Sequence, residues 1–235
     1  MLLVACVLAV LSVVMLLVGP LGARLGMWPF FVGFALMGGA ILDALAAIIV
    51  AVMAGMRTHR WGVALAAIGV AAVAMALPLF IVLPAMRFPP IHDITTDPDD
   101  PPAFDDALLK LRKTTDSPPA YDGPDAAAQQ RRAYPDIQPV VLNAPASRVF
   151  DAALDVAREQ GWQVVATDRA AGRIDAIAST FWFGFKDDVV IRLRPQEAVT
   201  RIDMRSKSRV GVGDLGANAR RIRLFVSALR DRLPS

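Results

Sequence analysis

The hydrophobic and polar positions divide the chain into an N-terminal part of long apolar runs and a C-terminal part with shorter periods. Residues 1–23 and 61–86 carry no charged side chain, and residues 25–56 carry only Asp43. A bilayer core of about 30 Å is crossed by about 20 apolar helical residues, so each run is long enough to span it. The pattern predicts three membrane-spanning helices, near residues 2–19, 30–54 and 62–86.

The charges between these runs predict their orientation. Arg57 and Arg60 lie between the second and third runs, whereas Arg24 alone lies between the first and second. Cytoplasmic loops of membrane proteins collect Lys and Arg, so the second loop is placed in the cytoplasm. The N-terminus is then cytoplasmic and the C-terminal part lies outside the cytoplasm. The first run is expected to stay uncleaved, because no Lys or Arg precedes it and no A-x-A-like site follows it.

Asp43 is the one ionisable residue inside the apolar runs. Such a residue is costly at membrane depth and marks a candidate functional position. We expect it to act as a polar contact that joins helices, with a proton relay as the alternative. Gly33, Gly38 and Gly39 on the same helix permit close approach of another helix, which leaves a homo-oligomer open.

Beyond Pro139 the pattern is that of a small α+β domain. Alternating apolar positions and turn signals predict strands at residues 140–142, 162–167, 173–183, 189–193 and 202–204. Apolar residues at helical spacing predict helices at about 146–160 and 217–233. The order β-α-β-β-β-β-α predicts an antiparallel sheet with two helices on one face.

The intervening segment, residues 88–138, predicts an acidic, Pro-rich linker. Ten of the 17 prolines lie from Phe88 to Pro139 inclusive, and six aspartates fall in His92–Asp106 with no Lys or Arg among them. Proline removes a backbone donor, so we expect an extended tether, or a strap lying on another surface, with one short helix capped by Asp105. The domains are therefore expected at residues 1–87, 88–138 and 139–235.

Composition supports this division. The chain is 55% hydrophobic and 20% charged, against roughly 45–50% and 25% for an ordinary soluble domain. Residues 1–86 hold only three of the 25 Lys and Arg and one of the 22 Asp and Glu. These figures exclude a single globular domain, and one Cys excludes a disulfide scaffold.

Positive charge is concentrated near the C-terminal end. Residues 201–232 hold nine Lys and Arg against three aspartates, so the sequence pI of about 9.4 is a local property and we expect no nucleic-acid partner. Arginines beside a helix N-terminus favour an anion, such as a lipid phosphate, a cell-surface polyanion or the protein's own acidic segment. The alternative is a solvated basic face on an exposed helix.

Other site patterns are incomplete. Gly211–Gly216 satisfies G-x-G-x-x-G, but the chain has no following parallel strand and acid, so no cofactor is expected. The aspartates after His92 lack the spacing of a calcium loop, and no metal is expected. The domain contains neither His nor Cys, which excludes Ser-His and Cys-His hydrolase chemistry within it. For Asp187 and Asp188 we expect a salt bridge to an arginine on the adjacent strand.

Two stretches resemble a known family. Phe183–Arg192 reads FGFKDDVVIR and Asp203–Ile222 reads DMRSKSRVGVGDLGANARRI. They are similar to the patterns F-x-D-D-V-x-x-R and R-S-x-S-R-x-G-x-x-D-L-G-x-N-x-x-R of the bacterial family called domain of unknown function 1499, over about residues 91–232. An Asn-Cys-Val-Ser-like segment found in many members is missing, so no role of that Cys carries over. The resemblance supplies no activity and implies a shared site or scaffold at Asp187, Asp188, Arg205, Ser206, Ser208, Arg209, Gly211, Asp214, Leu215, Gly216, Asn218 and Arg221.

Together these features predict a non-enzymatic protein of the bacterial inner membrane with a periplasmic α+β module. The module is expected to bind an anionic envelope component, for example anionic lipid, or a partner protein. The alternatives are an accessory subunit of a membrane complex that docks through Asp43, and, less favoured, an enzyme acting on a phosphorylated or anionic substrate. The candidate binding residues are Arg205, Ser206, Ser208, Arg209, Gly211, Asp214, Gly216, Asn218 and Arg221.

Overall fold

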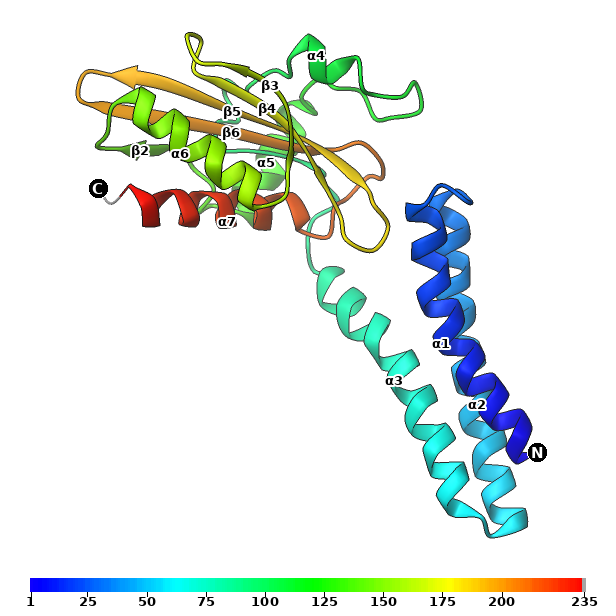
Figure 1. Cartoon of the computed structure of the whole chain (residues 1–235). Coiled ribbons are helices and arrows are strands. Elements are labelled where there is room, and N and C mark those ends of the chain that lie inside the picture. The colour runs from blue at the N-terminus through cyan, green and yellow to red at the C-terminus, as the bar shows by residue number, and fades with distance from the viewer. Residues whose placement is uncertain (234–235) are drawn as a thin grey trace. The chain divides into compact units, whose positions relative to one another are not determined.

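The structure is a computed structural model that describes residues 1–233, without the side chains of Ile81, Pro84 and Ala85 (Figure 1). The chain divides into two compact units. The first comprises Met1–Met86 with the short segment Thr180–Gly184, and the second comprises Arg87–Ser179 and the chain from Phe185 onward. Each unit is described by itself.

The first unit contains the three expected helices. They are α1 (Leu2–Arg24), α2 (Phe30–Thr58) and α3 (Trp61–Ala85), and all three are long and apolar enough to cross a membrane. The helices meet through small residues: a Cβ added at Gly19 would lie 2.9 Å from the carbonyl oxygen of Gly33. Small side chains at the interface are what permits close helix packing in lipid.

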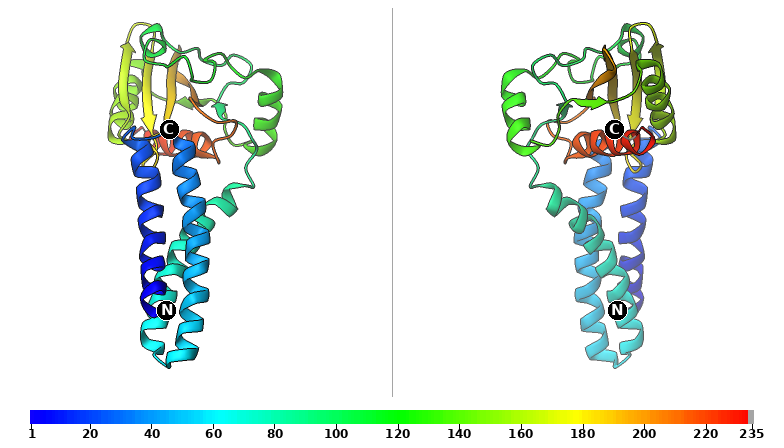
Figure 2. Two further views of the ribbon diagram at one scale, coloured as in Figure 1. Left: turned by 90° about the vertical axis from the view of Figure 1, so that its right-hand side faces the viewer. Right: turned by 90° about the vertical axis from the view of Figure 1, so that its left-hand side faces the viewer.

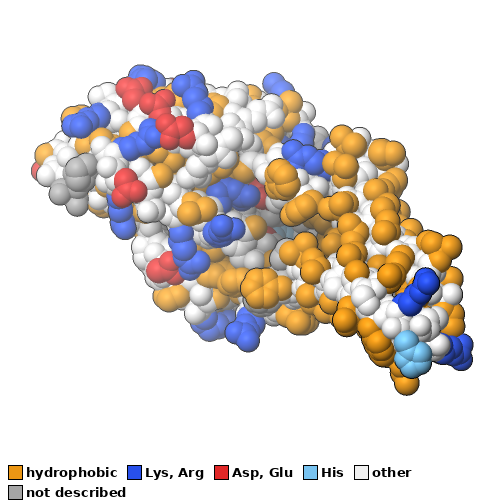
Figure 3. Space-filling view, turned by 60° about the horizontal axis from the view of Figure 1, so that its bottom comes forward, with side chains coloured by type: hydrophobic (Ala, Val, Ile, Leu, Met, Phe, Trp, Pro, Cys, Tyr) orange, Lys and Arg blue, Asp and Glu red, His pale blue; other side chains and the backbone are white. Residues whose placement is uncertain are grey.

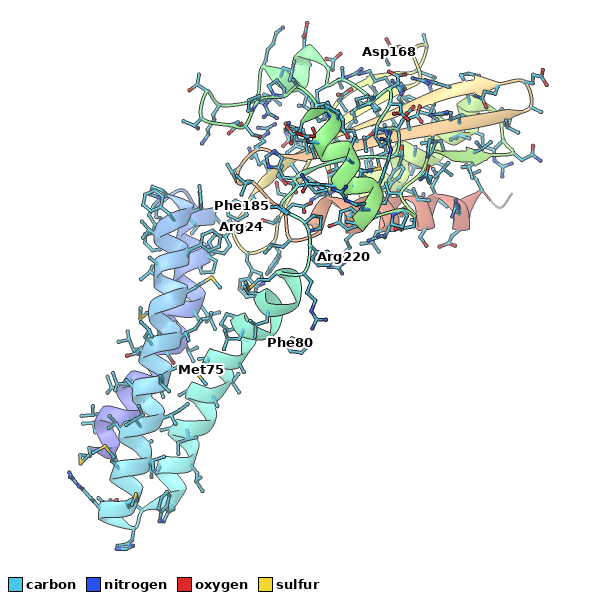
Figure 4. The ribbon with its side chains drawn as sticks, turned by 180° about the vertical axis from the view of Figure 1, so that it is seen from behind. Arg24, Met75, Phe80, Asp168, Phe185 and Arg220 are labelled. Atoms are coloured by element: carbon cyan, nitrogen blue, oxygen red, sulfur yellow. The ribbon has the colours of Figure 1, made fainter. Side chains whose placement is uncertain are left out.

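Large apolar side chains point outward from these helices. Leu3 and Phe80 are among the exposed ones, and Figure 4 shows Phe80 projecting from α3. Hydrophobic side chains cover the visible surface of the helices in Figure 3. Apolar side chains on the outside of the helices suit the hydrocarbon core of a bilayer, because exposing so much apolar area to water is unfavourable.

The second unit is built on a six-stranded antiparallel sheet. The strands are β1 (Asp93–Thr95), β2 (Val140–Leu142), β3 (Gln163–Asp168), β4 (Arg173–Ser179), β5 (Lys186–Gln196) and β6 (Val199–Ser208). Their order is β1-β6-β5-β4-β3, and β2 also pairs with β6. Both short strands lie along the same edge of β6, since β1 pairs with Arg205–Lys207 and β2 with Thr200–Ile202.

Two helices cover one face of the sheet, as the sequence predicted. They are α6 (Ala146–Glu159) and α7 (Ala217–Arg232) (Figure 1). Gly161, just after α6, has a left-handed backbone conformation, which is common where helices end. Alternate strand residues face these helices and form the main core, because successive side chains of a strand point to opposite faces. The core includes Ile174, Ala176, Val189, Ile191 and Met204 from the sheet, Val149, Phe150 and Ala153 from α6, and Ile222, Phe225 and Leu229 from α7.

The expected boundary at residue 139 differs from the structure, in which residues 88–138 pack as part of the second unit. Ile94 of β1 is fully buried in the main core. Two short helices follow, α4 (Asp106–Leu109), capped by Asp105, and α5 (Gly123–Ala133). Figure 2 shows α5 and α6 at opposite sides of this unit. The segment is therefore a strap rather than a free tether; we call residues 96–122 the acidic strap.

The strand expected at residues 173–183 ends earlier. β4 stops at Ser179, and Trp182, which the expected strand included, is half exposed. Ser179 is the last residue of β4 that pairs with β5, opposite Lys186, so the next six residues form the connection between the two strands.

The position of the boundary is testable with two fragments. A fragment of residues 139–235 lacks β1, the acidic strap and α5, so it exposes one face of the sheet and part of the core. We expect residues 87–235 to unfold cooperatively and residues 139–235 to show no cooperative transition, because packing of that face is lost. Thermal unfolding followed by circular dichroism measures this, and equal cooperativity in both fragments would contradict the placement of the strap in the domain.

Candidate functional site

The sheet face toward α6 and α7 is apolar, and the opposite face is mostly charged, with a small apolar cluster of Phe104, Leu108, Ile177 and Val190; we call it the charged face. Along β6, alternate residues on the side away from α6 and α7 are Arg201, Asp203, Arg205 and Lys207, and Arg209 follows the strand. Their partners on β5 include Asp188, opposite Lys207, and Arg192, opposite Asp203. A strand with charges at alternate positions in the interior of a sheet requires a covering layer that neutralises them. The acidic strap and β1 supply most of that layer.

Arg205 is held by a bidentate ion pair. Its Nε and Nη2 donate to Oδ1 and Oδ2 of Asp93, each at 2.8 Å. The remaining donors meet the carbonyl oxygens of Pro102 (3.2 Å) and Pro119 (2.9 Å), and the guanidinium carbon lies 4.5 Å from the ring centroid of Phe104. Only 2% of Arg205 is exposed. Planar guanidinium and carboxylate groups match in this fork geometry, so the pairing is specific as well as strong.

Lys207 is fully buried, which is rare for lysine unless it is paired. Its Nζ lies 2.5 Å from Oδ1 of Asp122 and 3.3 Å from Oδ2 of Asp93. It also donates to the carbonyl oxygen of Ala120 at 2.7 Å. All three donors of the ammonium group therefore find oxygen partners on β1 and at the C-terminal end of the strap.

Arg209, directly after β6, is the last basic residue of this series. Its Nε and Nη2 donate to Oδ1 of Asp188 at 2.9 and 2.6 Å, and its Nη1 donates to the carbonyl oxygen of Leu111 at 2.9 Å. Arg112 of the strap bonds the other oxygen of Asp188. One oxygen of the buried Asp188 carboxylate therefore bonds to Arg209, which follows β6, and the other bonds to Arg112 of the strap.

The charged face is electrically neutral in the part of the chain that the structure describes. Within residues 1–233, the ion pairs on this face join eight basic to eight acidic side chains. The bases are Arg112, Arg173, Arg192, Arg194, Arg201, Arg205, Lys207 and Arg209, and the acids are Asp93, Asp97, Asp100, Asp116, Asp122, Asp175, Asp188 and Asp203. Arg205 and Arg209, which the sequence suggested as ligand-binding groups, are therefore occupied by the protein's own carboxylates.

Other residues of the sequence pattern fasten α7 to the sheet on its opposite face. Ser206 Oγ donates to Asn218 Oδ1 at 2.7 Å, and Asn218 Nδ2 donates to Ser208 Oγ at 2.9 Å. Arg221 donates to Ser206 Oγ at 2.8 Å and lies 2.5 Å from Oδ2 of Asp187. These contacts form one buried network, so the candidate residues come together as a structural joint between β6 and α7.

The turn before α7 contains the carboxyl group of Asp214 at the N-terminus of the helix. Asp214 accepts hydrogen bonds from the backbone N–H groups of Gly216 at 2.9 Å and Asn218 at 2.6 Å. It therefore occupies the place at the helix N-terminus where an anionic ligand was expected. Burial raises the pKa of the Asp214 carboxyl, and the two backbone donors oppose that effect. At the start of the same turn, the carbonyl oxygen of Gly211 lies 2.5 Å from Nδ1 of His92.

The exposed part of this region lies at the loop tip and on α7. Val212 is 82% exposed and Leu215 is 54% exposed. Arg220 and Arg230 are exposed on α7, and neither forms an ion pair within residues 1–233. Figure 4 labels Arg220 near the N-terminal end of the helix. The residues expected from the sequence are mostly the buried positions of this pattern. Of the exposed residues, Leu215 stood in the family pattern and the arginines of α7 in the basic segment, whereas Val212 was not singled out from the sequence.

Two cavities lie beside α7 and α5. One of about 380 Å³ is lined by residues 136–140 and by α7 residues that include Arg223 and Arg230. The other, of about 300 Å³, is lined by residues of the strap, by α5 and by Arg201. Neither contains Asp187, Asp188, Arg205 or Arg209. An enzyme that acts on an anionic substrate through these four groups would need a concave pocket that contains them, and neither of these cavities provides it.

Asp43 belongs to the first unit, whereas the other candidate residues belong to the second. It lies on α2, and its Oδ2 is buried without a hydrogen-bond partner among the described residues. A polar atom in this situation is costly at membrane depth, which keeps Asp43 a candidate for contact with another polar group.

Fold and sequence together define a class of protein in which a small α+β domain follows three helices that are apolar enough to cross a membrane. The chain belongs to the family described as Protein of unknown function (DUF1499), which matches residues 93–229. This confirms the resemblance noted in the sequence. The match begins at β1, so the family pattern includes the strap as well as the later strands.

Other comparisons add little. No curated protein matches the chain. Among solved structures, the di-domain ARO/CYC StfQ from the steffimycin biosynthetic pathway is 15% identical, with a TM-score of 0.32 over 41% of this chain and 44% of that chain. TTHA0849 from Thermus thermophilus is 14% identical, with a TM-score of 0.26 over 40% of this chain and 92% of that chain. The chain spans less than half of the length of StfQ, and neither similarity is close enough to indicate function.

The shared carboxylate of Asp188 gives a stability prediction. Asp188→Asn leaves Arg209 and Arg112 buried without their common counter-charge, so we expect a loss of about 3–5 kcal/mol in the free energy of unfolding. Asp100→Asn is the matched control, because the Asp100 carboxylate is largely exposed and its pairs should contribute at most about 1 kcal/mol. Denaturant unfolding of residues 87–235 measures both, and equal losses would contradict the ranking.

The raised pKa of Asp214 predicts a pH dependence. The folded domain holds this proton more tightly than the unfolded chain, so the stability from Asp214 is fully present below the unfolded pKa. It is lost as pH rises through the folded pKa. The free energy of unfolding of wild type minus that of Asp214→Asn should therefore fall as the pH rises above the ordinary pKa of an aspartate, about 3.9. Denaturant titrations at a series of pH values measure it; a difference that rises with pH would show that the cap bonds outweigh burial.

Proposed function

We propose that this chain is a non-enzymatic protein of the bacterial inner membrane whose second unit binds an anionic component of the envelope. In this proposal α1, α2 and α3 span the membrane with the N-terminus in the cytoplasm, and the second unit lies in the periplasm. The binding surface is the outer face of α7, rather than the buried arginines of β6. The observation that carries the proposal is the contrast between a fully neutralised sheet face and the exposed basic side chains of α7.

The outer face of α7 is formed by residues at helical spacing. Arg220, Arg223, Leu224, Ser227 and Arg230 are exposed and recur every three or four residues. Arg223 is paired with Asp136 at 2.6 Å, whereas Arg220 and Arg230 have no acidic partner within residues 1–233. A basic helix face with an exposed leucine is typical of helices that lie on anionic surfaces.

Charge on the exposed side of a helix is also the ordinary arrangement in soluble domains. The unpaired arginines distinguish α7 from that case, because carboxylates neutralise nearly all basic groups on the charged face of the sheet. Each Lys or Arg near an anionic membrane surface contributes about 1 kcal/mol to binding. Two free arginines therefore supply a measurable preference for an anionic component.

An accessory subunit of a membrane complex is the second candidate. The buried, unpartnered Oδ2 of Asp43 favours it, since a polar group of another membrane helix would satisfy that atom. Purification in a mild detergent that yields only monomer would count against this candidate. The two proposals concern different units of the chain and are tested independently.

The anion-binding proposal predicts the effect of reversing two charges. We expect the full chain with Arg220→Glu and Arg230→Glu to retain less phosphatidylglycerol than wild type, with at least a roughly tenfold weaker preference over phosphatidylcholine. Native mass spectrometry of the protein in neutral detergent, after exchange with defined lipid mixtures, measures the retained lipid. The three apolar helices are unchanged between variants, so a difference reports on α7.

The matched control is Arg148→Glu with Arg158→Glu. Both arginines are exposed on α6, and the pair produces the same change in net charge. We expect this control to retain phosphatidylglycerol as wild type does. Equal retention by all three proteins, or equal loss in both double variants, would reject α7 as the binding face.

A further inference from the structure

We infer that the loop Arg209–Gly216 inserts its apolar tip into the surface of the same bilayer that holds the three helices. This inference rests on the proposed function and names the anionic component as the lipid headgroups next to the anchor. The loop would act as a second, interfacial attachment point. Four observations support it.

The loop presents apolar side chains to solvent at a conformational cost. Val212 is 82% exposed, and Leu215 is 54% exposed in a left-handed conformation with φ of 53°. A residue other than Gly, Asn or Asp is uncommon there, and such strain costs on the order of 1–3 kcal/mol. The neighbouring cap from Asp214 holds this geometry.

The loop lies against the first residues of the second unit. A Cβ on Gly216 would lie 3.2 Å from the ring of Phe88, and one on Gly213 would lie 3.2 Å from Cα of Pro90. The backbone N–H of Asp214 also donates to the carbonyl oxygen of Ile91 at 3.3 Å. The loop is therefore packed onto the segment that enters the domain from α3.

That segment is short. α3 ends at Ala85, and Phe88 follows only three residues later. An extended chain advances at most about 3.6 Å per residue, so Phe88 lies within about 11 Å of the helix end in any arrangement of the two units. If α3 spans the membrane, the covalent connection alone keeps Phe88 and the loop packed against it near the bilayer surface.

The surrounding side chains suit such a surface. Arg87 and Arg220 are exposed, and so is Lys186 at the start of β5, whose carbonyl oxygen accepts from the backbone N–H of Arg209 at 3.1 Å. β4 ends at this same end of the sheet, because Ser179 pairs with Lys186. Basic residues of this kind suit an anionic bilayer surface, where each contributes about 1 kcal/mol to binding.

A depth measurement on the full chain tests the inference. In a Cys6→Ala background, a single cysteine at Val212 or at Ala198 is labelled with an environment-sensitive fluorophore, and the protein is placed in nanodiscs. Ala198 lies in the turn between β5 and β6, at the opposite end of these strands. About ten residues of strand separate the two positions by roughly 30 Å. We expect quenching by spin-labelled lipid to be at least about threefold stronger at Val212, with a blue-shifted emission.

A second variant keeps the test independent of labelling at Val212. With the label at Leu215, Val212→Asp should reduce the quenching, whereas Val141→Asp, which alters an exposed apolar residue on β2, should not. Quenching at position 212 no greater than at Ala198, in both neutral and phosphatidylglycerol-containing discs, would overturn the inference. The proposed function would survive that result if lipid retention still depended on Arg220 and Arg230. Insertion without such dependence would support the loop and reject the proposed binding face.

Discussion

The ion pairing between the acidic strap and the charged face of the sheet is the interaction on which the second unit depends. β6 carries basic groups at Arg201, Arg205 and Lys207 in the middle of a hydrogen-bonded sheet, where an unpaired charge is prohibitive. The strap and β1 provide carboxylates at hydrogen-bonding distance and cover them from water. Since desolvation offsets much of the attraction in such pairs, their main effect is to fix one register. Sheet and strap must therefore form together.

This arrangement assigns a structural role to most of the family pattern. Arg205 and Arg209 neutralise carboxylates, Asp214 caps α7, and Asn218 joins that helix to β6. All four side chains have their hydrogen-bonding capacity engaged inside the domain. The pattern that makes the family recognisable thus describes how the domain is held together. The large exposed side chains of this region include Val212 and Leu215 in the loop and Arg220, Arg223, Leu224 and Arg230 on α7.

The sequence predicted the elements whose signals are local, and missed those that depend on distant partners. Three helices followed from length and hydropathy, and the long strands and α6 and α7 followed from periodicity. Residues 93–95 were too short to show a period, and the Pro-rich acidic run has the composition of a solvated tether. Its character as a strap depends on pairs such as Asp97 with Arg201, which are 104 residues apart. For the same reason Arg205 and Arg209 were expected to bind an anionic ligand, because the sequence does not show that distant carboxylates already pair with them.

The short segment that follows α3 connects the two units covalently, whatever their relative orientation. Phe88 and Pro90 pack on the loop that begins α7, and Ile91 bonds to Asp214 within it. The cap of α7 is joined in turn, through Asn218, to Ser206 and Ser208 at the C-terminal end of β6. The loop's exposed valine and leucine lie at that junction, so the part of the domain closest along the chain to the lipid is also the part whose side chains suit it.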